Sequence, residues 1–131
     1  MRNRNLGFTL LRQSGFTLLE LLVVIVIIGL LAGYVAPKYF SQVGKSEVQV
    51  ARAQIDSLEK ALDQYRLDKR RYPTAEEGLT AVQPYLKKSL PADPWGRPYV
   101  YRSSAGEVEI VSLGRDGKSG GQGEDADIKN R

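Results

Sequence analysis

The segment GFTLLRQSGFTLLELLVVIVIIGLL, residues 7–31, contains nearly the same short sequence twice. Gly-Phe-Thr-Leu-Leu occupies residues 7–11 and again residues 15–19, but Arg12 follows the first copy and Glu20 follows the second. The two copies therefore differ in the sign of the charge that comes after them. Only the second copy places a carboxylate at the start of a long apolar run, and this arrangement decides how the rest of the chain is interpreted.

The apolar run covers residues 16–36, which is 21 residues with one charged side chain. A helix of this length, at about 1.5 Å per residue, extends over roughly 30 Å and spans the hydrocarbon core of a bilayer. A cleavable secretory signal has an apolar region of only about 7 to 15 residues, so the run is too long for that class of signal. The sequence predicts a membrane helix. Pro37 follows it, and a helix that continued through Pro37 would lose one backbone hydrogen bond and kink.

The carboxylate inside this segment needs a partner. An acidic side chain costs about 2.5 to 3.5 kcal/mol at the centre of a membrane helix, and less near the end, where Glu20 lies. Cleavage between Gly15 and Phe16 would create an α-amine one helical turn before Glu20, or on a neighbouring copy of the helix. Cleavage after Gly7 would instead place the new amine near Arg12, which has the same charge. We therefore predict that the chain is cut between Gly15 and Phe16.

These residues resemble a known family. The segment SGFTLLELLVVIVIIGLLAGYVAPKYF is similar to the class III signal of type IV pilins and pseudopilins, in which a basic leader and a glycine precede Phe-Thr-Leu-x-Glu. The resemblance implies that a prepilin peptidase cuts after Gly15 on the cytoplasmic side of the inner membrane and N-methylates Phe16. It also implies that Glu20 registers subunits in a helical filament by pairing with the Phe16 amine of a neighbour. Glu20 and Pro37 are the candidate assembly residues.

The charge is distributed unevenly along the 131 residues. Three arginines and no acid precede Gly15, which leaves 16 basic and 15 acidic residues after it. The basic leader holds the N-terminus in the cytoplasm, and the nearly neutral remainder lacks the basic stripe that nucleic-acid binding requires. The chain has no cysteine and no histidine, which excludes disulfides, zinc fingers, thiol nucleophiles and the commonest general base.

The length leaves room for the membrane helix and one small domain of about ninety residues. We divide the chain into a cleaved leader, a hydrophobic helix and a soluble domain, at residues 1–15, 16–40 and 41–131. The chain is long enough for only one such domain, and its rigidity has to come from something other than disulfides.

An apolar stripe predicts that the helix continues beyond the membrane segment. Between residues 47 and 67, apolar side chains recur every three or four positions and so share one helix face. They are Val48, Ala51, Ile55, Leu58, Leu62 and Tyr65. A coiled coil uses the same pattern, but the stripe lasts less than about three heptads, so we expect it to pack on the rest of the soluble domain. The helix is predicted to end at residues 70–73. Thr74 and Glu77 have capping-box spacing and predict a short helix to about Val82.

Two segments near the C-terminus have strand character. Residues 99–103 and 107–113 alternate or are β-branched, and Ser-Ala-Gly between them indicates a hairpin connection. Trp95 lies in a turn rich in proline and glycine, and we expect it to fill the core rather than to bind a ligand. The predicted fold class is α+β: a long N-terminal helix, with a membrane half and an amphipathic half, packed on a small antiparallel sheet with a loop-rich tail.

Three further segments narrow the resemblance. RRYPTAEEGLTAV, LPADPWGRPYVY and SLGRDGKSGGQGEDADI resemble the protein G family, the major pseudopilins of the type II secretion system, and the similarity covers nearly the whole chain from Gly15. It implies a subunit with a single pass through the bacterial inner membrane and its C-terminal domain in the periplasm. This subunit polymerises with itself into a pseudopilus that drives export of folded proteins across the outer membrane. The implied partners are prepilin peptidase, minor pseudopilins, the inner-membrane assembly platform and the lipid of that membrane.

The segment LGRDGKSGGQGEDADI combines four acidic side chains with five glycines. Calcium takes about six to eight oxygen ligands, and carboxylates together with carbonyls of a flexible backbone suit it. On composition alone, a solvated flexible tail is the alternative. The resemblance implies that a calcium ion orders this loop. At the matching positions the ligands are the Leu113 carbonyl, the Asp116 carboxylate, a backbone oxygen near Gln122, and the carboxylates of Asp125 and Asp127, with Glu124 as an alternative to Asp127.

Two other functions fit parts of the sequence. A type IV pilin for adhesion, motility or DNA uptake would have the same helix, but such pilins usually carry a C-terminal disulfide. A membrane-anchored enzyme would depend on carboxylate pairs such as Glu76 with Glu77, or Asp125 with Asp127. Close neighbours in a chain rarely face one substrate from two sides, so we expect a structural subunit without catalytic activity.

Overall fold

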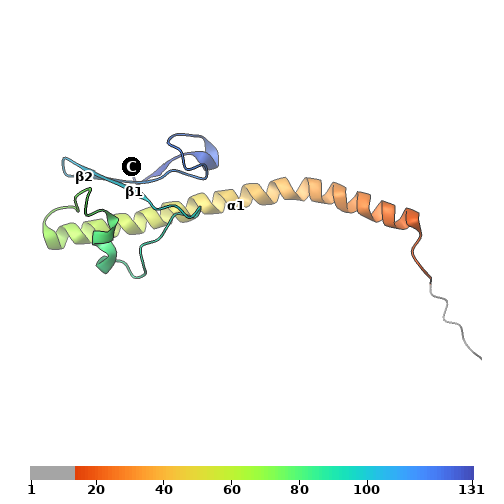
Figure 1. The fold of residues 1–131 in the computed structure, drawn as a ribbon, viewed down its shortest axis with the longest axis horizontal. Coiled ribbons are helices and arrows are strands. Elements are labelled where there is room, and N and C mark those ends of the chain that lie inside the picture. The colour runs from red at the N-terminus through yellow and green to blue at the C-terminus, as the bar shows by residue number, and fades with distance from the viewer. Residues whose placement is uncertain (1–13) are drawn as a thin grey trace, which may run out of the picture. The chain divides into compact units, whose positions relative to one another are not determined.

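The computed structural model describes residues 14–131, and most of the predicted leader, including Gly7 and Arg12, lies outside the described residues. The chain divides into two compact units, the second of which is Tyr39–Arg131. Helix α1 (Leu18–Lys69) contributes its N-terminal part to the first unit and its C-terminal part to the second (Figure 1). The prediction that the apolar helix continues into the soluble domain is confirmed.

Helix α1 is 52 residues long and contains Pro37 without interruption. Proline has no backbone N–H, so one carbonyl in the preceding turn has no helical donor. At its C-terminus the helix stops where the sequence predicted. Arg70 adopts a left-handed conformation with φ 63°, and its N–H donates to the Arg66 carbonyl at 2.8 Å. This arrangement is a left-handed cap, which satisfies one carbonyl of the last turn.

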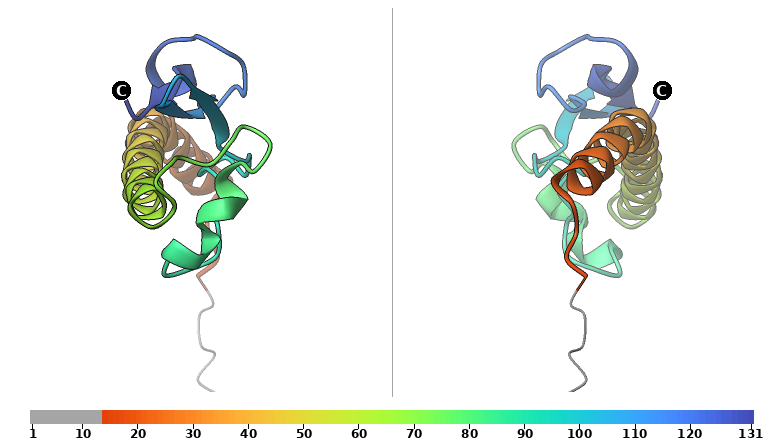
Figure 2. Two further views of the ribbon diagram at one scale, coloured as in Figure 1. Left: turned by 90° about the vertical axis from the view of Figure 1, so that its left-hand side faces the viewer. Right: turned by 90° about the vertical axis from the view of Figure 1, so that its right-hand side faces the viewer.

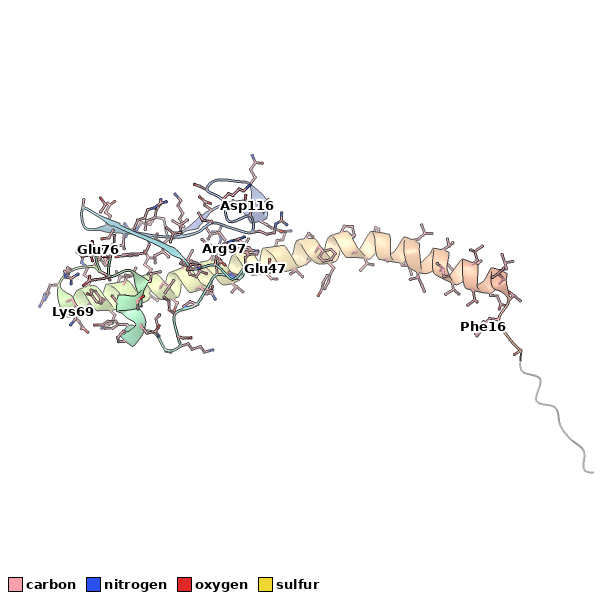
Figure 3. All side chains as sticks on the ribbon, viewed as in Figure 1. Phe16, Glu47, Lys69, Glu76, Arg97 and Asp116 are labelled. Atoms are coloured by element: carbon pink, nitrogen blue, oxygen red, sulfur yellow. The ribbon has the colours of Figure 1, made fainter. Side chains whose placement is uncertain are left out.

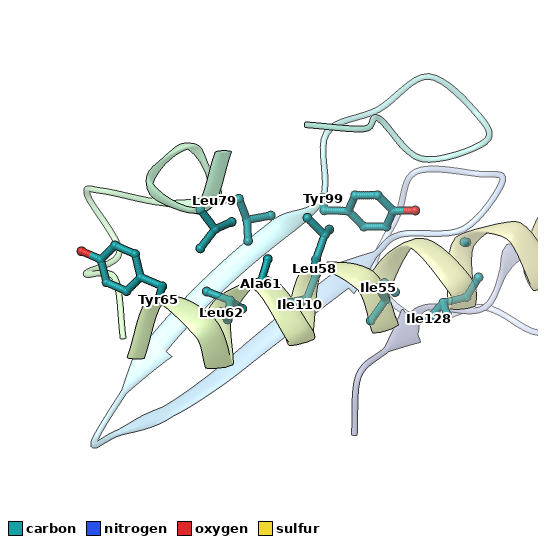
Figure 4. Packing of buried hydrophobic residues seen from close by; sticks show 11 residues of the cluster. Ile55, Leu58, Ala61, Leu62, Tyr65, Leu79, Tyr99, Ile110 and Ile128 are labelled. Atoms are coloured by element: carbon teal, nitrogen blue, oxygen red, sulfur yellow. The ribbon is translucent and has the colours of Figure 1, made fainter. Parts of the chain in front are cut away.

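The core of the second unit lies between α1 and the segments that follow it. The predicted stripe on α1 is buried from Ala51 to Tyr65, Val48 is partly buried at its edge, and Ala61 joins it. Leu58 and Leu62 are 0% exposed and pack with Ile110 of the sheet (Figure 4). The stripe therefore packs within the domain and is not left open for a coiled coil. Trp95 packs against this core, as expected.

Within this unit, the sheet covers one side of α1. Strands β1 (Val100–Ser104) and β2 (Glu107–Ser112) pair antiparallel, with Ser104 opposite Glu107. The connection is the two-residue turn Ala105–Gly106, and both residues have positive φ, as a type I′ hairpin turn requires. The predicted hairpin is confirmed. Strand β3 (Ile128–Lys129) adds to β2 antiparallel and gives the order β1-β2-β3, in a tail that we expected to be loop-rich.

The short helix after α1 differs from the prediction. The expected capping box is present, because the Glu77 N–H donates to Thr74 Oγ1 at 3.2 Å and the Thr74 N–H donates to Glu77 Oε2 at 2.7 Å. The helix itself is the 3₁₀-helix η1 (Leu79–Tyr85), which starts after the cap and runs past Val82. Gly78, with φ 58°, separates the cap from the helix and prevents a continuous α-helix. Figure 2 shows η1 and the sheet on different sides of the C-terminal part of α1.

Candidate functional site

The first candidate site is the start of α1. The Glu20 N–H donates to Thr17 Oγ1 at 3.2 Å, and the Thr17 N–H donates to Glu20 Oε2 at 3.1 Å. These two bonds form a capping box that satisfies two of the otherwise unpaired N–H groups at the helix N-terminus. Sequence analysis missed Thr17, although Thr-x-x-Glu is the same signal that it used correctly at Thr74. Glu20 therefore has a hydrogen-bond partner within its own chain before any cleavage.

The predicted cleavage bond lies immediately before this cap. Gly15 has nothing within 4 Å of the position of a Cβ, and Phe16 is 84% exposed (Figure 3). The bond between them lies in exposed chain without regular secondary structure that precedes α1, and a peptidase needs such accessible backbone. One oxygen of Glu20 is bonded to Thr17, which leaves the other available to a cation. The Phe16 amine pair itself requires cleavage, so it stays a prediction.

The apolar part of α1 has no covering layer among the described residues. Its long apolar side chains are largely exposed, and the helix is long and apolar enough to cross a membrane. Exposure of such a stripe to water is unfavourable, so the helix needs lipid or other helices around it.

The second candidate site is the acid loop, which we define as residues 113–127. Arg115 lies at its centre and makes a bidentate ion pair with Asp125, with Nε 2.9 Å from Oδ1 and Nη2 3.2 Å from Oδ2. Arg115 Nη1 also lies 2.8 Å from Glu124 Oε2. Hydrogen bonding to Asp125 raises the pKa of Arg115, and the guanidinium stays charged. The sequence analysis did not consider this arginine.

The predicted calcium ligands lie in this loop, and they differ in whether their carboxylate oxygens already have a hydrogen-bond partner. Both carboxylate oxygens of Asp125 are bonded to Arg115, and Asp116 accepts from the Lys118 N–H at 3.0 Å. Asp127 Oδ2 accepts from the Gly120 N–H at 3.1 Å, whereas its Oδ1 is buried without a hydrogen-bond partner.

The backbone ligands lie in the same loop. The Gln122 carbonyl accepts from the Asp125 N–H at 3.1 Å. The tight backbone is possible because Gly114 and Gly121 have positive φ and a Cβ on either would clash with the Asp125 carbonyl. Within residues 14–131, no three acidic side chains are gathered closely enough to form a metal site. The calcium site stays a prediction. The unpaired Asp127 oxygen fits it, and Asp125 fits only if Arg115 moves away.

The turn around Trp95 holds the base of the acid loop. Asp93 is 4% exposed, and its carboxylate accepts from the N–H groups of Trp95 and Arg97 and from the Ser112 hydroxyl, at 3.1, 2.8 and 2.9 Å. Arg97 Nη1 donates to the carbonyls of Gly114 and residue 115, at 3.0 and 3.1 Å. A buried carboxylate with three donors is fully compensated, so it fixes the turn against the sheet.

Two contacts connect these segments to α1. Trp95 Nε1 donates to Glu47 Oε2 at 3.1 Å. Gly44 is buried under Glu124, and a Cβ on Gly44 would lie only 2.0 Å from Glu124 Cδ. A glycine inside a helix costs about 1 kcal/mol relative to alanine, so this position gives up helix stability to admit the acid loop. The sequence signal, a lone glycine in a helical pattern, was available but was not used.

The fold and the N-terminal motif together define a class. A chain with a capped glutamate at the start of an exposed apolar helix, followed by a small α+β unit on the same helix, is a pilin-like membrane subunit. Residues 12–36 match the family model described as the prokaryotic N-terminal methylation motif. Residues 38–131 match the model described as type II secretion system (T2SS), protein G.

Curated relatives agree with this match. The type II secretion system core protein G of Pseudomonas aeruginosa is 45% identical over 91% of this chain and 95% of its own length. The protein of the same name from Vibrio cholerae is 43% identical, over 91% and 92%. A crystal structure of the major pseudopilin from the type 2 secretion system of enterohaemorrhagic Escherichia coli is similar with a TM-score of 0.52 and 38% identity, over 66% of this chain and 87% of that one. The chain belongs to the protein G family of the type II secretion system.

This family is one of structural secretion-system subunits, and the match favours it over the type IV pilins that share the same N-terminal helix. In each carboxylate pair considered for an enzyme, one member makes a structural contact. Glu77 caps a turn and pairs with Arg71, and Asp125 pairs with Arg115.

Proposed function

We propose that this chain is the major structural subunit of a type II secretion pseudopilus. The observation that carries this proposal is that one chain contains both the methylation motif, at residues 12–36, and the protein G domain, at residues 38–131. The membrane helix stores the subunit in the inner membrane by a single pass, with the second unit in the periplasm. Self-assembly into a filament then drives folded proteins across the outer membrane.

Processing is the first step of this function. A prepilin peptidase cuts the bond between Gly15 and Phe16 and N-methylates the new amine. The exposed backbone without regular secondary structure before α1 supports this site. Mass spectrometry of the mature N-terminus from native membranes tests it, and the expected first residue is N-methylated Phe16. A native chain that began at Met1 or Phe8 would contradict the site.

Assembly depends on the charge of Glu20, and the capping box allows a sharp test. Glutamine at position 20 retains the bond from the Thr17 N–H, because Gln serves as well as Glu in a capping box. Glu20→Gln therefore removes the charge and keeps the cap, whereas Glu20→Ala removes both. If pairing with the Phe16 amine of a neighbour drives subunit addition, both variants insert in the membrane, and neither forms filaments or supports secretion.

Thr17→Val is the matched variant, because it removes the side-chain cap and leaves the charge of Glu20. We expect it to assemble with reduced efficiency only. Normal secretion by Glu20→Gln would contradict the ion-pair mechanism and leave helix capping as the role of Glu20. Cells are compared at native expression, with filament recovery and export of a folded substrate as the two measurements.

The filament grows in contact with other components. We propose that minor pseudopilins, the inner-membrane assembly platform and membrane lipid are the partners of the first unit and of the filament end. The apolar, uncovered helix supports this, because it needs either lipid or neighbouring helices around it. No catalytic step is assigned to this chain. Site-specific crosslinking from an exposed position in the apolar helix, such as Leu30, tests this, with subunit-to-subunit products expected in assembled filaments.

Calcium is proposed to stabilise the acid loop. The buried, unpaired Asp127 Oδ1 supports it. The other proposed ligands are Asp116, Asp125 and the carbonyls of Leu113 and Gln122. When bound, the ion would be ligated by several carboxylates and would crosslink the loop in a chain without disulfides. Because the ion binds only the folded state, its binding stabilises that state. In detergent micelles, the melting temperature of the full chain should be higher with calcium than with chelator. Asp127→Asn or Asp116→Ala should remove most of that difference, and an unchanged difference would exclude the site.

A further inference from the structure

Arg115 is the cation around which the acid loop closes. Its guanidinium contacts three carboxylate oxygens of Glu124 and Asp125 between 2.8 and 3.2 Å. Its backbone N–H also donates to the Glu124 carbonyl at 3.0 Å. The same residue thus fastens the loop through its backbone and its side chain. The Arg115 side chain is 56% exposed, so it lies at the surface of the loop and can leave without disturbing the core.

The position of Arg115 conflicts with one proposed calcium ligand. A carboxylate oxygen that accepts a bidentate guanidinium is not free to ligate a metal, and two cations at one carboxylate repel each other. Asp125 is therefore occupied in the metal-free chain, whereas Asp127 Oδ1 is unpaired. In the described residues the loop therefore contains one buried, unpaired carboxylate oxygen, on Asp127, and one carboxylate, Asp125, that is already neutralised.

We propose that Arg115 and a divalent cation bind Asp125 alternately, and that Arg115 is the built-in counter-ion that keeps the acid loop closed in the metal-free chain. This inference rests on the calcium proposal above. Without the ion, the guanidinium neutralises Glu124 and Asp125 and holds the loop against Gly44 of α1. With the ion, Asp125 turns to the metal and the guanidinium is released into solvent. Arg115 therefore lowers the affinity for calcium and raises the stability of the metal-free loop.

The direct test is isothermal titration of calcium into the full chain in detergent micelles. Arg115→Gln removes the competing cation, and we expect calcium to bind about twofold to fivefold more tightly, which is the upper part of the range that exposed ion pairs provide. Lys118→Gln is the matched control. It removes the same charge from the same loop, but in the described part of the chain the Lys118 side chain forms no ion pair. Its affinity for calcium should change by less than about twofold.

A second measurement tests whether Arg115 and calcium exchange at Asp125, or whether removal of a positive charge by itself raises the calcium affinity. In chelator, Arg115→Gln should melt at a lower temperature than the unaltered chain, whereas in saturating calcium the two should melt together. Arg115→Lys keeps the charge but not the bidentate geometry. Its calcium affinity should therefore lie between that of the unaltered chain and that of Arg115→Gln. Fluorescence of Trp95, the single tryptophan, verifies that each variant is folded.

The outcomes distinguish this inference from the calcium proposal. If the unaltered chain binds calcium and Arg115→Gln has the same affinity as Lys118→Gln, calcium binds but Arg115 does not compete, and the exchange is overturned. If neither the unaltered chain nor Arg115→Gln binds calcium at millimolar concentration, both proposals are wrong. An affinity that rises in Arg115→Gln but not in Lys118→Gln, with lower stability of Arg115→Gln in chelator, supports the exchange.

Discussion

Replacement of Asp93 tests whether the turn around Trp95 holds the acid loop in place. The carboxylate is 4% exposed and accepts three hydrogen bonds, from the Trp95 and Arg97 N–H groups and the Ser112 hydroxyl. A hydrogen bond to a charged group contributes about 1.5 to 3 kcal/mol, and a buried donor left unpaired costs about 1 to 3 kcal/mol. The three bonds share one acceptor and are not additive, so we expect Asp93→Ala to lower the free energy of unfolding by about 3 to 5 kcal/mol.

Asp93→Asn is the graded variant. The amide oxygen can still accept from the two backbone N–H groups, and the amide NH₂ can donate to the Ser112 oxygen once its hydroxyl rotates. Only the assistance of the charge is lost, so the expected cost is about 1 to 2 kcal/mol. Ser112→Ala removes the bond to Asp93 and the longer bond from the Gly114 N–H, at 3.4 Å, and should cost a similar amount, about 1 to 2 kcal/mol.

The assay is urea unfolding of the full chain in detergent micelles, followed by tryptophan fluorescence. Trp95 is the only tryptophan and lies in the turn itself, so the signal reports the second unit and not the membrane helix. A small domain has about 5 to 15 kcal/mol of stability, so a loss of 3 to 5 kcal/mol shifts the midpoint clearly. If Asp93→Ala unfolded within about 0.5 kcal/mol of the unaltered chain, the three bonds would not be what fixes the turn.

Three further predictions concern the core, the hairpin and the pH dependence. Leu58→Ala, at a site that is 0% exposed, should destabilise the second unit by about 3 to 5 kcal/mol, whereas Leu67→Ala, at 70% exposure, should change it by less than about 0.5 kcal/mol in the same urea assay. Ala105→Asn places a residue that tolerates positive φ in the type I′ turn and should raise stability by about 0.5 to 1 kcal/mol, whereas a decrease would contradict the assigned turn. The arginine partner and the turn N–H lower the pKa of Glu77 from 4.5 to about 2, so its stabilising effect is complete above pH 4.5 and is lost as the pH falls towards about 2. In melting-temperature measurements across that range, Glu77→Gln should lack this part of the pH dependence, and Glu76→Gln, its exposed neighbour, should retain it.

Local sequence patterns predicted most helices and strands of the second unit. The features that they did not predict, such as strand β3, depend on contacts between residues far apart in the sequence. The period of the α1 stripe and the spacing of Thr74 and Glu77 depend on residues a few positions apart, and the structure has both. Strand β3 has two residues and no alternation to detect, and it exists because β2 offers a free edge. The Asn130 side chain, which accepts from the Ile110 N–H at 3.0 Å, continues that pairing. Such a contact joins residues 20 apart and leaves no local signal.

The candidate sites show the same difference between local sequence signals and contacts that only the structure reveals. The cleavage bond stays a prediction, and it was singled out together with Glu20 because the sequence signal is local. Thr17 was missed because only charged partners of Glu20 were considered, not a neutral hydrogen-bond partner. The competition at Asp125 was not visible in a composition of glycines and acids, since a loop that suits calcium also suits an arginine. Only the geometry shows that the Arg115 guanidinium faces Glu124 and Asp125.

The acid loop is joined to the part of α1 that follows the membrane helix. Gly44 lies under Glu124, Glu47 accepts from the Trp95 indole, and the Trp95 turn binds the base of the loop through Arg97. A chain without cysteine therefore fastens its C-terminal loop to its helix by polar contacts and one close glycine. Because Arg115 pairs with both Glu124, which lies over Gly44, and Asp125, the proposed site of exchange, loss of this counter-ion should loosen the helix surface as well. Hydrogen exchange at residues 44–49 should rise in chelator for Arg115→Gln and not for Lys118→Gln, and equal exchange in both would show that loop and helix are uncoupled.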